Sequence, residues 1–140
     1  MKLTVASSPH IRGNFRTNRI MLDVVLALLP ALAVGIWMLG IRALVVTLIS
    51  VSSAVVAEWL YSLVTKTRNT VVDGSAMVTG LLLALNLPVG IPLWQAAFGS
   101  LVAIVVVKQL FGGIGHNFAN PAITARIVML IAFAGTMTTW

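Results

Sequence analysis

The chain alternates between long apolar runs and short polar or basic segments. The first two runs cover residues 20–39 and 43–64, and a single acid interrupts each of them, Asp23 in the first and Glu58 in the second. Each run is close to the ~20 residues that a helix needs to cross a bilayer. Only residues 40–42 separate the two runs. The pattern predicts two antiparallel membrane-spanning helices joined by a tight turn.

The later apolar runs are shorter and are interrupted by glycine and proline. The third run covers residues 76–87 and leads into the segment 86–92, which contains Pro88, Gly90 and Pro92. Proline disfavours helical backbone in the residue before it, and short interrupted runs are typical of broken membrane helices. We expect a short third helix with its broken end covered by protein or water. This run can either cross fully or turn back.

Two further runs complete the pattern. The fourth covers residues 93–107 and ends at Lys108, whose ammonium we expect to reach the membrane interface. The last run, residues 127–140, is too short to cross a bilayer, so we expect the chain to be cut within a fifth helix. The predicted fold class is all-α, a multi-spanning integral membrane helical bundle. A basic segment, residues 1–19, precedes a membrane domain, residues 20–140.

Composition supports a membrane environment. The chain is 59% hydrophobic and 9% charged, whereas a soluble domain carries about 25% charged residues. The net charge of +6 comes from bases at the ends of apolar runs, where membrane orientation signals lie. We therefore expect membrane lipid and no nucleic acid as a partner. The bases of residues 1–19, with Lys66 and Arg68, predict a cytoplasmic N-terminus, and Arg42 lies on the opposite side.

Small residues in the second run predict close helix packing. Spacings of three and four residues bring positions to one helical face, and here they align Ser50, Ser53, Ala54 and Ala57. Small side chains let a neighbouring membrane helix approach closely. We interpret this face as a packing surface and not as a substrate path.

Metal chemistry and disulfides are not predicted. The chain contains no cysteine, and its two histidines, His10 and His116, are too far apart in sequence for a local metal motif. The residues themselves also indicate no catalytic group.

The least ordinary segment is residues 111–121, which is rich in glycine and asparagine. Its glycines, at 112, 113 and 115, permit backbone conformations closed to other residues and a close approach by a ligand. The amides of Asn117 and Asn120 can each donate and accept hydrogen bonds, as the edge of a flavin ring would require. A structural interpretation gives Gly112 or Gly113 a helix C-cap role, with Asn120 as an N-cap before Pro121. The two interpretations are compatible.

Three acids are further candidates. Asp73 precedes the third run, where it or Ser75 would cap the helix, although a helix N-terminus also attracts anions. Asp23 and Glu58 lie inside apolar runs, where ionisable residues are candidates for an ion pathway. We expect Asp23 to pair with Arg19, four residues earlier on the same helix.

Four stretches together are similar to one family. They are residues 8–10, 19–23, 73–84 and 111–122, with the sequences SPH, RIMLD, DGSAMVTGLLLA and FGGIGHNFANPA. In combination they resemble the D subunit of the Rnf electron-transport complex and the related B subunit of the sodium-translocating NADH:quinone oxidoreductase. The resemblance covers nearly the whole chain, and the ending MTTW is similar to the Rnf branch.

The resemblance implies a flavoprotein of the bacterial cytoplasmic (inner) membrane that works with the other subunits of the Rnf complex. It would carry electrons within a ferredoxin:NAD⁺ oxidoreductase and couple them to Na⁺ or H⁺ transport, without being catalytic alone. Non-covalent riboflavin would lie at the loop containing Asn117 and Asn120. Covalent FMN would be attached to a threonine downstream of this chain, and we do not assign it to Thr79.

Two other classes fit the apolar pattern. A membrane channel or secondary transporter, without a redox cofactor, also has broken helices and intramembrane acids. A structural membrane scaffold is the third alternative. A flavin spectrum in the purified protein would distinguish the first class from the other two.

Overall fold

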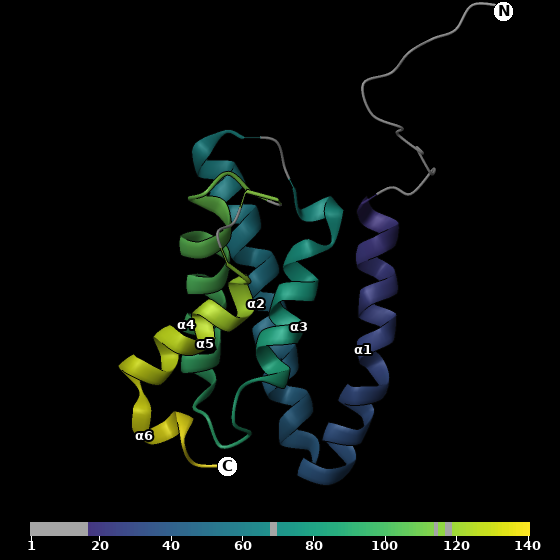
Figure 1. Cartoon of the computed structure of the whole chain (residues 1–140), viewed down its shortest axis with the longest axis vertical. Helices are drawn as coiled ribbons and strands as arrows, with labels where there is room; N and C mark the ends of the chain where they lie inside the picture. The colour runs from purple at the N-terminus through teal and green to yellow at the C-terminus, as the bar shows by residue number, and fades with distance from the viewer. Residues whose placement is uncertain (1–16, 68–69, 114, 117–118) are drawn as a thin grey trace, which may run out of the picture.

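The computed structural model describes residues 17–67, 70–113, 115–116 and 119–140. Within these ranges the chain forms helices and connecting turns, without strands (Figure 1). The main helices are α1 (Thr17–Leu39), α2 (Ile41–Thr65), α3 (Ser75–Leu85), α4 (Leu93–Leu101), α5 (Pro121–Ala132) and α6 (Ala134–Met137). A 3₁₀ turn, η1 (Val71–Asp73), precedes α3, and a π-helix, η2 (Val102–Gln109), continues α4. The all-α fold is confirmed for the part of the chain described.

Helices α1 and α2 form the predicted hairpin. Both are long and apolar enough to cross a membrane. Gly40 joins them at φ 81°, a conformation that glycine adopts without steric cost. Helix α1 includes residues 17–19, which precede the first apolar run. The preceding bases, Lys2, Arg12 and Arg16, lie outside the described residues.

The small face of α2 is where α3 packs. Ser50, Ala54 and Ala57 are buried there, and Ser53 is half-buried. Gly80 of α3 approaches so closely that an added Cβ would lie 2.8 Å from the Cα of Val51. The hydroxyl of Ser50 donates to the Gly80 carbonyl at 3.0 Å. The predicted packing role of this face is confirmed.

The predicted break after α3 is also present. Helix α3 ends at Leu85, and α4 begins at Leu93. At 1.5 Å per residue, a helix as short as α3 does not span the ~30 Å hydrocarbon core alone. Leu87, Pro88 and Ile91 are buried within the connection. Side chains from other elements satisfy its polar groups: Arg42 Nε donates to the Val89 carbonyl at 2.9 Å, and Arg126 Nη1 donates to Asn86 Oδ1 at 2.9 Å. Protein therefore covers the break.

The fourth apolar run changes its helical winding halfway. Helix α4 passes directly into η2. The backbone bonds at the end of η2 join residues five positions apart, from Leu110 N to Val105 O and from Gly113 N to Lys108 O. Such π segments are rare in proteins, and those that occur often lie at functional sites. This change was not predicted from the sequence.

We expected the last apolar run to form part of one helix, but it divides between two helices, α5 and α6. Helix α5 begins at Pro121, as predicted for that residue, and ends at Ala132. Phe133 then leaves helical geometry, at φ −133° and ψ 47°, and α6 follows. The Phe133 ring meets Trp94 and Phe98 of α4 edge to face, with centroids 5.3 and 5.8 Å apart. Packing against α4 thus ends α5 although the apolar pattern continues.

The connections divide between the two ends of the bundle. In Figure 1 the start of α1, the end of α2 and the turn after η2 lie at the upper end. The α1–α2 turn, the α3–α4 connection and the C-terminus lie at the lower end. The glycine-rich turn after η2 therefore shares an end with the start of α1, as the predicted topology requires.

Candidate functional site

A buried acid–base cluster joins α2, α3 and η2. Glu58 of α2 is 0% exposed and Lys108 of η2 is 2% exposed. Lys108 Nζ lies 2.6 Å from Glu58 Oε1. The same carboxylate oxygen accepts from Thr70 Oγ1 at 2.5 Å and from Gln109 Nε2 at 2.9 Å. Lys108 also donates to the hydroxyl of Ser75. We call these five residues the Glu58 cluster.

The π-helix explains how two consecutive residues reach one carboxylate. An α-helix turns its side chains by about 100° per residue. A π-helix has more residues per turn, so neighbouring side chains diverge less. Lys108 and Gln109 both lie in η2, and both donate to Glu58 Oε1. The altered winding thus concentrates donors on the buried acid.

The hydrogen bonding of Glu58 is uneven. Oε1 accepts bonds from three side chains, whereas no donor among the described residues reaches the buried Oε2. A buried carboxylate requires both a counter-charge and hydrogen bonds. The single ammonium of Lys108 supplies the counter-charge, so Glu58 depends on it.

Two sequence predictions about this region are wrong. Lys108 does not extend to an interface, because its side chain is buried against Glu58. The cap of α3 is Gly74, at φ 73°, and neither Asp73 nor Ser75 makes a side-chain cap bond. Turn η1 brings Gly74 into a left-handed conformation, and the Ser75 hydroxyl bonds Lys108 instead.

The glycine–asparagine segment is partly described. Gly112, Gly113 and Gly115 all have positive φ, at 102°, 91° and 84°, as expected for glycines that reverse the chain. Asn120 Oδ1 accepts from the Ala122 amide at 3.0 Å, and Pro121 occupies the first turn of α5. The predicted cap at Asn120 is confirmed. Asn117 lies outside the described residues.

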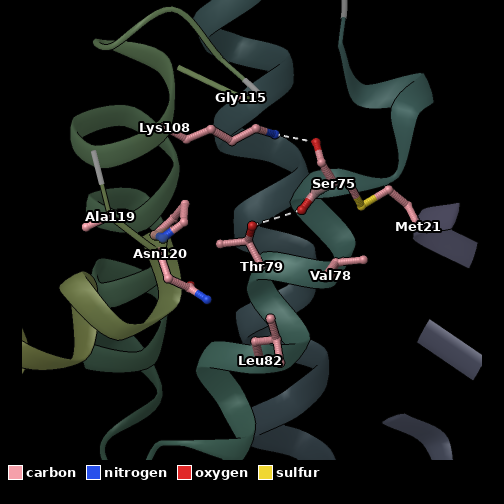
Figure 2. Close-up of a pocket in the computed structure, with 10 residues that line it drawn as sticks. Met21, Ser75, Val78, Thr79, Leu82, Lys108, Gly115, Ala119 and Asn120 are labelled. Carbon is pink, nitrogen blue, oxygen red and sulfur yellow. Dashed lines mark hydrogen bonds between the residues drawn. The ribbon is translucent and has the colours of Figure 1, made fainter. Parts of the chain in front are cut away.

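A pocket of about 340 Å³ separates this segment from α3 and α1. Its lining is mainly apolar, and Lys108 is the only charged side chain among the ten residues that form it. These are Met21, Ser75, Val78, Thr79, Leu82, Lys108, Gly115, Ala119, Asn120 and Pro121. Figure 2 shows Asn120 extending toward α3 from one wall, with Lys108 and Ser75 meeting at the upper edge. The pocket therefore brings together two predicted site residues, Gly115 and Asn120, with two that we did not predict as ligand contacts, Lys108 and Ser75.

The other predicted residues lie elsewhere. Gly112 and Gly113 precede the pocket in the turn after η2 and do not line it. Asp23 is exposed on α1. Of the described residues, only Glu58 and Lys108 form an ion pair, so Asp23 makes none with Arg19. Thr79 lines the pocket, and its hydroxyl donates to the Ser75 carbonyl at 2.9 Å.

Curated proteins similar to this chain are components of ion-translocating oxidoreductases. The D subunit of the Na⁺-translocating ferredoxin:NAD⁺ oxidoreductase complex of Acetobacterium woodii is 49% identical over 138 residues, which is 99% of this chain and 43% of the relative. The D subunit of the proton-translocating complex of Clostridium ljungdahlii is 42% identical, covering 98% of this chain and 41% of the relative. The D subunit of the ion-translocating oxidoreductase complex of Shewanella sediminis is 41% identical, covering 100% and 41%.

These relatives are longer than the chain, which spans about two fifths of their length. A sequence model of the NQR2, RnfD, RnfE family matches residues 4–140. The match covers the hairpin, the broken third helix, the Glu58 cluster and the glycine–asparagine segment. The chain belongs to the NQR2, RnfD, RnfE family.

Proposed function

We propose that this chain belongs to a membrane subunit of an ion-translocating ferredoxin:NAD⁺ oxidoreductase complex, and that its pocket binds a flavin. The observation that carries the flavin proposal is the pocket between α3 and the segment leading to Asn120. The relatives' names supply the reaction, and the other subunits of the complex are the proposed partners.

The pocket fits a flavin ring by size and chemistry. Ligand pockets usually have volumes of about 300–1,000 Å³ and apolar walls with a few polar groups, and this one measures about 340 Å³. Val78 and Leu82 supply apolar wall, while Asn120 and Ser75 supply polar groups. A bound flavin would supply electron transfer, and riboflavin is the form expected from the family resemblance. Asn117, three residues before Asn120, is the second proposed amide contact.

The residues of the chain would bind and enclose the ring. Asn120 uses Oδ1 to cap α5, which leaves its Nδ2 as the donor for a ligand carbonyl. Gly115 lines the pocket with no Cβ, so a ligand can approach its backbone closely. The covalent FMN, which we expect on a threonine downstream of this chain, is a prediction independent of this pocket.

Ion transport is the second part of the proposal. Glu58 is the buried acid of α2, and its Oε2 has no donor among the described residues. A carboxylate buried in a membrane protein is a candidate for Na⁺ or H⁺ binding. Asp23, exposed on α1, remains the second predicted acid of the pathway.

The proposed location is the bacterial cytoplasmic membrane, with the N-terminus in the cytoplasm. Lys66 follows α2 at the same end of the bundle as the start of α1, and Arg42 follows the turn at the other end (Figure 1). Together with the bases of residues 1–16, this distribution supports a cytoplasmic N-terminus. The exposed apolar side chains of α1, including Trp37 and Met38, would contact lipid or other subunits.

Visible absorbance of the purified full-length subunit tests the flavin proposal. We expect a flavin spectrum, with part of the flavin released on denaturation. Asn120→Asp keeps the oxygen that caps α5 but removes the amide donor, so released flavin should fall while the protein remains folded. Asn117→Ala should lower released flavin as well.

A colourless, folded subunit would contradict the proposal and favour a channel or transporter. Unchanged flavin content in both variants would contradict the assignment to this loop.

A further inference from the structure

Lys108 is a member of both the pocket and the Glu58 cluster. Its side chain lines the pocket, and its ammonium bonds Glu58 Oε1 and the Ser75 hydroxyl. Glu58 is fully buried and does not line the pocket. The positive member of the ion pair is therefore the one that faces the ligand.

This arrangement gives the pocket an electrostatic preference. Of the ten lining residues Lys108 alone carries a charge, and the remainder are apolar or neutral polar groups. Lys108 is 2% exposed, and charge interactions are stronger for groups that are shielded from water. The Lys108 ammonium consequently favours whichever state of a bound ligand carries more negative charge. Glu58 does not line the pocket, so its negative charge lies farther from a bound ligand than the ammonium does. Glu58 therefore weakens the attraction for a negatively charged ligand without cancelling it.

Glu58 also determines where the ammonium lies. Lysine has a long flexible stem and three rotatable donors, and an isolated ammonium in this position would tend to move toward water. The 2.6 Å pair with Glu58 and the bond to Ser75 hold it at the pocket wall. The π-winding of η2 directs Lys108 and Gln109 toward the same acid. These contacts together keep one positive charge at the pocket wall, where a ligand would bind.

We propose that Lys108 raises the reduction potential of the flavin bound in this pocket, and that Glu58 is the positioning residue that holds Lys108 and moderates its charge. The inference rests on the proposed flavin site. It assigns to the pair a role in setting electron affinity, apart from any role of Glu58 in ion transport.

The test is a redox titration of the full-length subunit, followed by visible absorbance, with the releasable flavin measured separately after denaturation. Lys108→Met should lower the midpoint potential of the releasable flavin. A tenfold change in the affinity ratio of the two redox states corresponds to about 30 mV for a two-electron couple, and we expect at least this shift. Glu58→Gln, which keeps a hydrogen-bond acceptor but removes the opposing charge, should raise the potential. Lys66→Met removes an exposed lysine at the end of α2 and should leave the potential unchanged.

Opposite shifts from the two variants separate this role from a purely structural one, because general loosening of the site would not change sign. Bound flavin with wild-type potential in Lys108→Met would overturn the proposal. A lowered potential in Glu58→Gln would overturn the proposed moderating effect of the Glu58 charge. If the single variants do not fold, Lys108→Arg and the neutral double variant Glu58→Gln/Lys108→Met are compared. The arginine variant should retain the potential, and the double variant should lower it, because the lost positive charge is the nearer one. A double variant at the wild-type potential overturns the proposal. Absence of releasable flavin from the wild-type protein would instead contradict the proposed function.

Discussion

Lys108 Nζ lies 2.6 Å from Glu58 Oε1, and the two residues are fifty positions apart in the sequence. The pair joins α2 to η2, and Lys108 lies next to the last residue of η2. Because both side chains are buried, removing either one leaves the other charge without its partner in a site with little access to water. The pair therefore has two consequences: it holds α2 against η2, and it fixes the position of Lys108 at the pocket wall.

The first prediction concerns the stability of this pair. Removing one partner of a buried ion pair typically costs about 3–5 kcal/mol, because the remaining charge is left without compensation. Glu58→Gln and Lys108→Met should each lower the free energy of unfolding, measured for the full-length protein in detergent, by an amount of this order. The double variant should lose less than the sum of the two single losses.

The matched control for this prediction is Lys66→Met. Lys66 is exposed after α2, and surface substitutions usually change stability by less than about 0.5 kcal/mol. Additive losses in the double variant would mean that Glu58 and Lys108 do not interact in the folded protein.

The sequence predicted the helical elements better than it predicted their partners. Apolar run length indicates the two long helices, and Pro88 and Pro92 indicate the break between α3 and α4. These are local properties, which the chain carries in its own pattern. The pairing of Glu58 with Lys108 depends on how α2 and η2 lie together in space. One signal for it was available: Lys108 is a base at the end of an apolar run, at the same predicted end of the bundle as the acid Glu58.

The remaining differences have similar physical causes. The π-winding of η2 makes its bonds within one continuous apolar stretch, so hydrophobic periodicity does not reveal it. The turn at Phe133 depends on the rings of Trp94 and Phe98, which belong to another helix. Of the residues that line the pocket, the sequence analysis proposed Asn120 and Gly115 as ligand contacts but did not propose Lys108. Local signals located the Asn120 cap but not the cap of α3, which is Gly74. The small face of α2 indicated that a helix packs there, but the sequence did not indicate which side chain pairs with Glu58.

The second prediction concerns the contact between α2 and α3. A Cβ at Gly80 would meet backbone atoms of α2, the Val51 Cα at 2.8 Å and the Ser50 carbonyl oxygen at 3.0 Å. Backbone cannot rotate away as a side chain would, so Gly80→Ala should force the helices apart. Overpacking of this kind typically costs about 1–3 kcal/mol. Unfolding in detergent measures the loss.

Gly35 supplies the control for the glycine substitution. It lies within α1, with no atom within 4 Å of an added Cβ. Alanine favours a helix over glycine by about 1 kcal/mol, so Gly35→Ala should be neutral or stabilising. If Gly80→Ala were equally well tolerated, α2 and α3 could not be packed as closely as described.

The third prediction separates the two roles of Asn120. Its Oδ1 accepts the Ala122 amide and caps α5, and loss of an N-cap costs about 0.5–2 kcal/mol. Asn120→Ala should therefore lower both stability and flavin content, whereas Asn120→Asp should lower flavin content alone. Parallel measurement of unfolding free energy and releasable flavin tests this. If Asn120→Asp destabilised the protein as much as Asn120→Ala, the cap would not explain the stability loss.

The fourth prediction concerns the turn between α5 and α6. Phe133 makes edge-to-face contacts with Trp94 and Phe98, and each such pair contributes about 0.5–1.5 kcal/mol beyond its buried area. Phe133→Ala removes both contacts and should destabilise the protein by at least about 1 kcal/mol, the lower sum of two such pairs. Phe133→Tyr keeps the ring and is the matched control, since its hydroxyl alone should change stability little. Limited proteolysis should reveal faster cleavage after α5 in Phe133→Ala than in the tyrosine variant. Equal cleavage and equal stability in the two variants would mean that contacts with α4 do not hold this turn, and that backbone preferences around Phe133 end α5 instead.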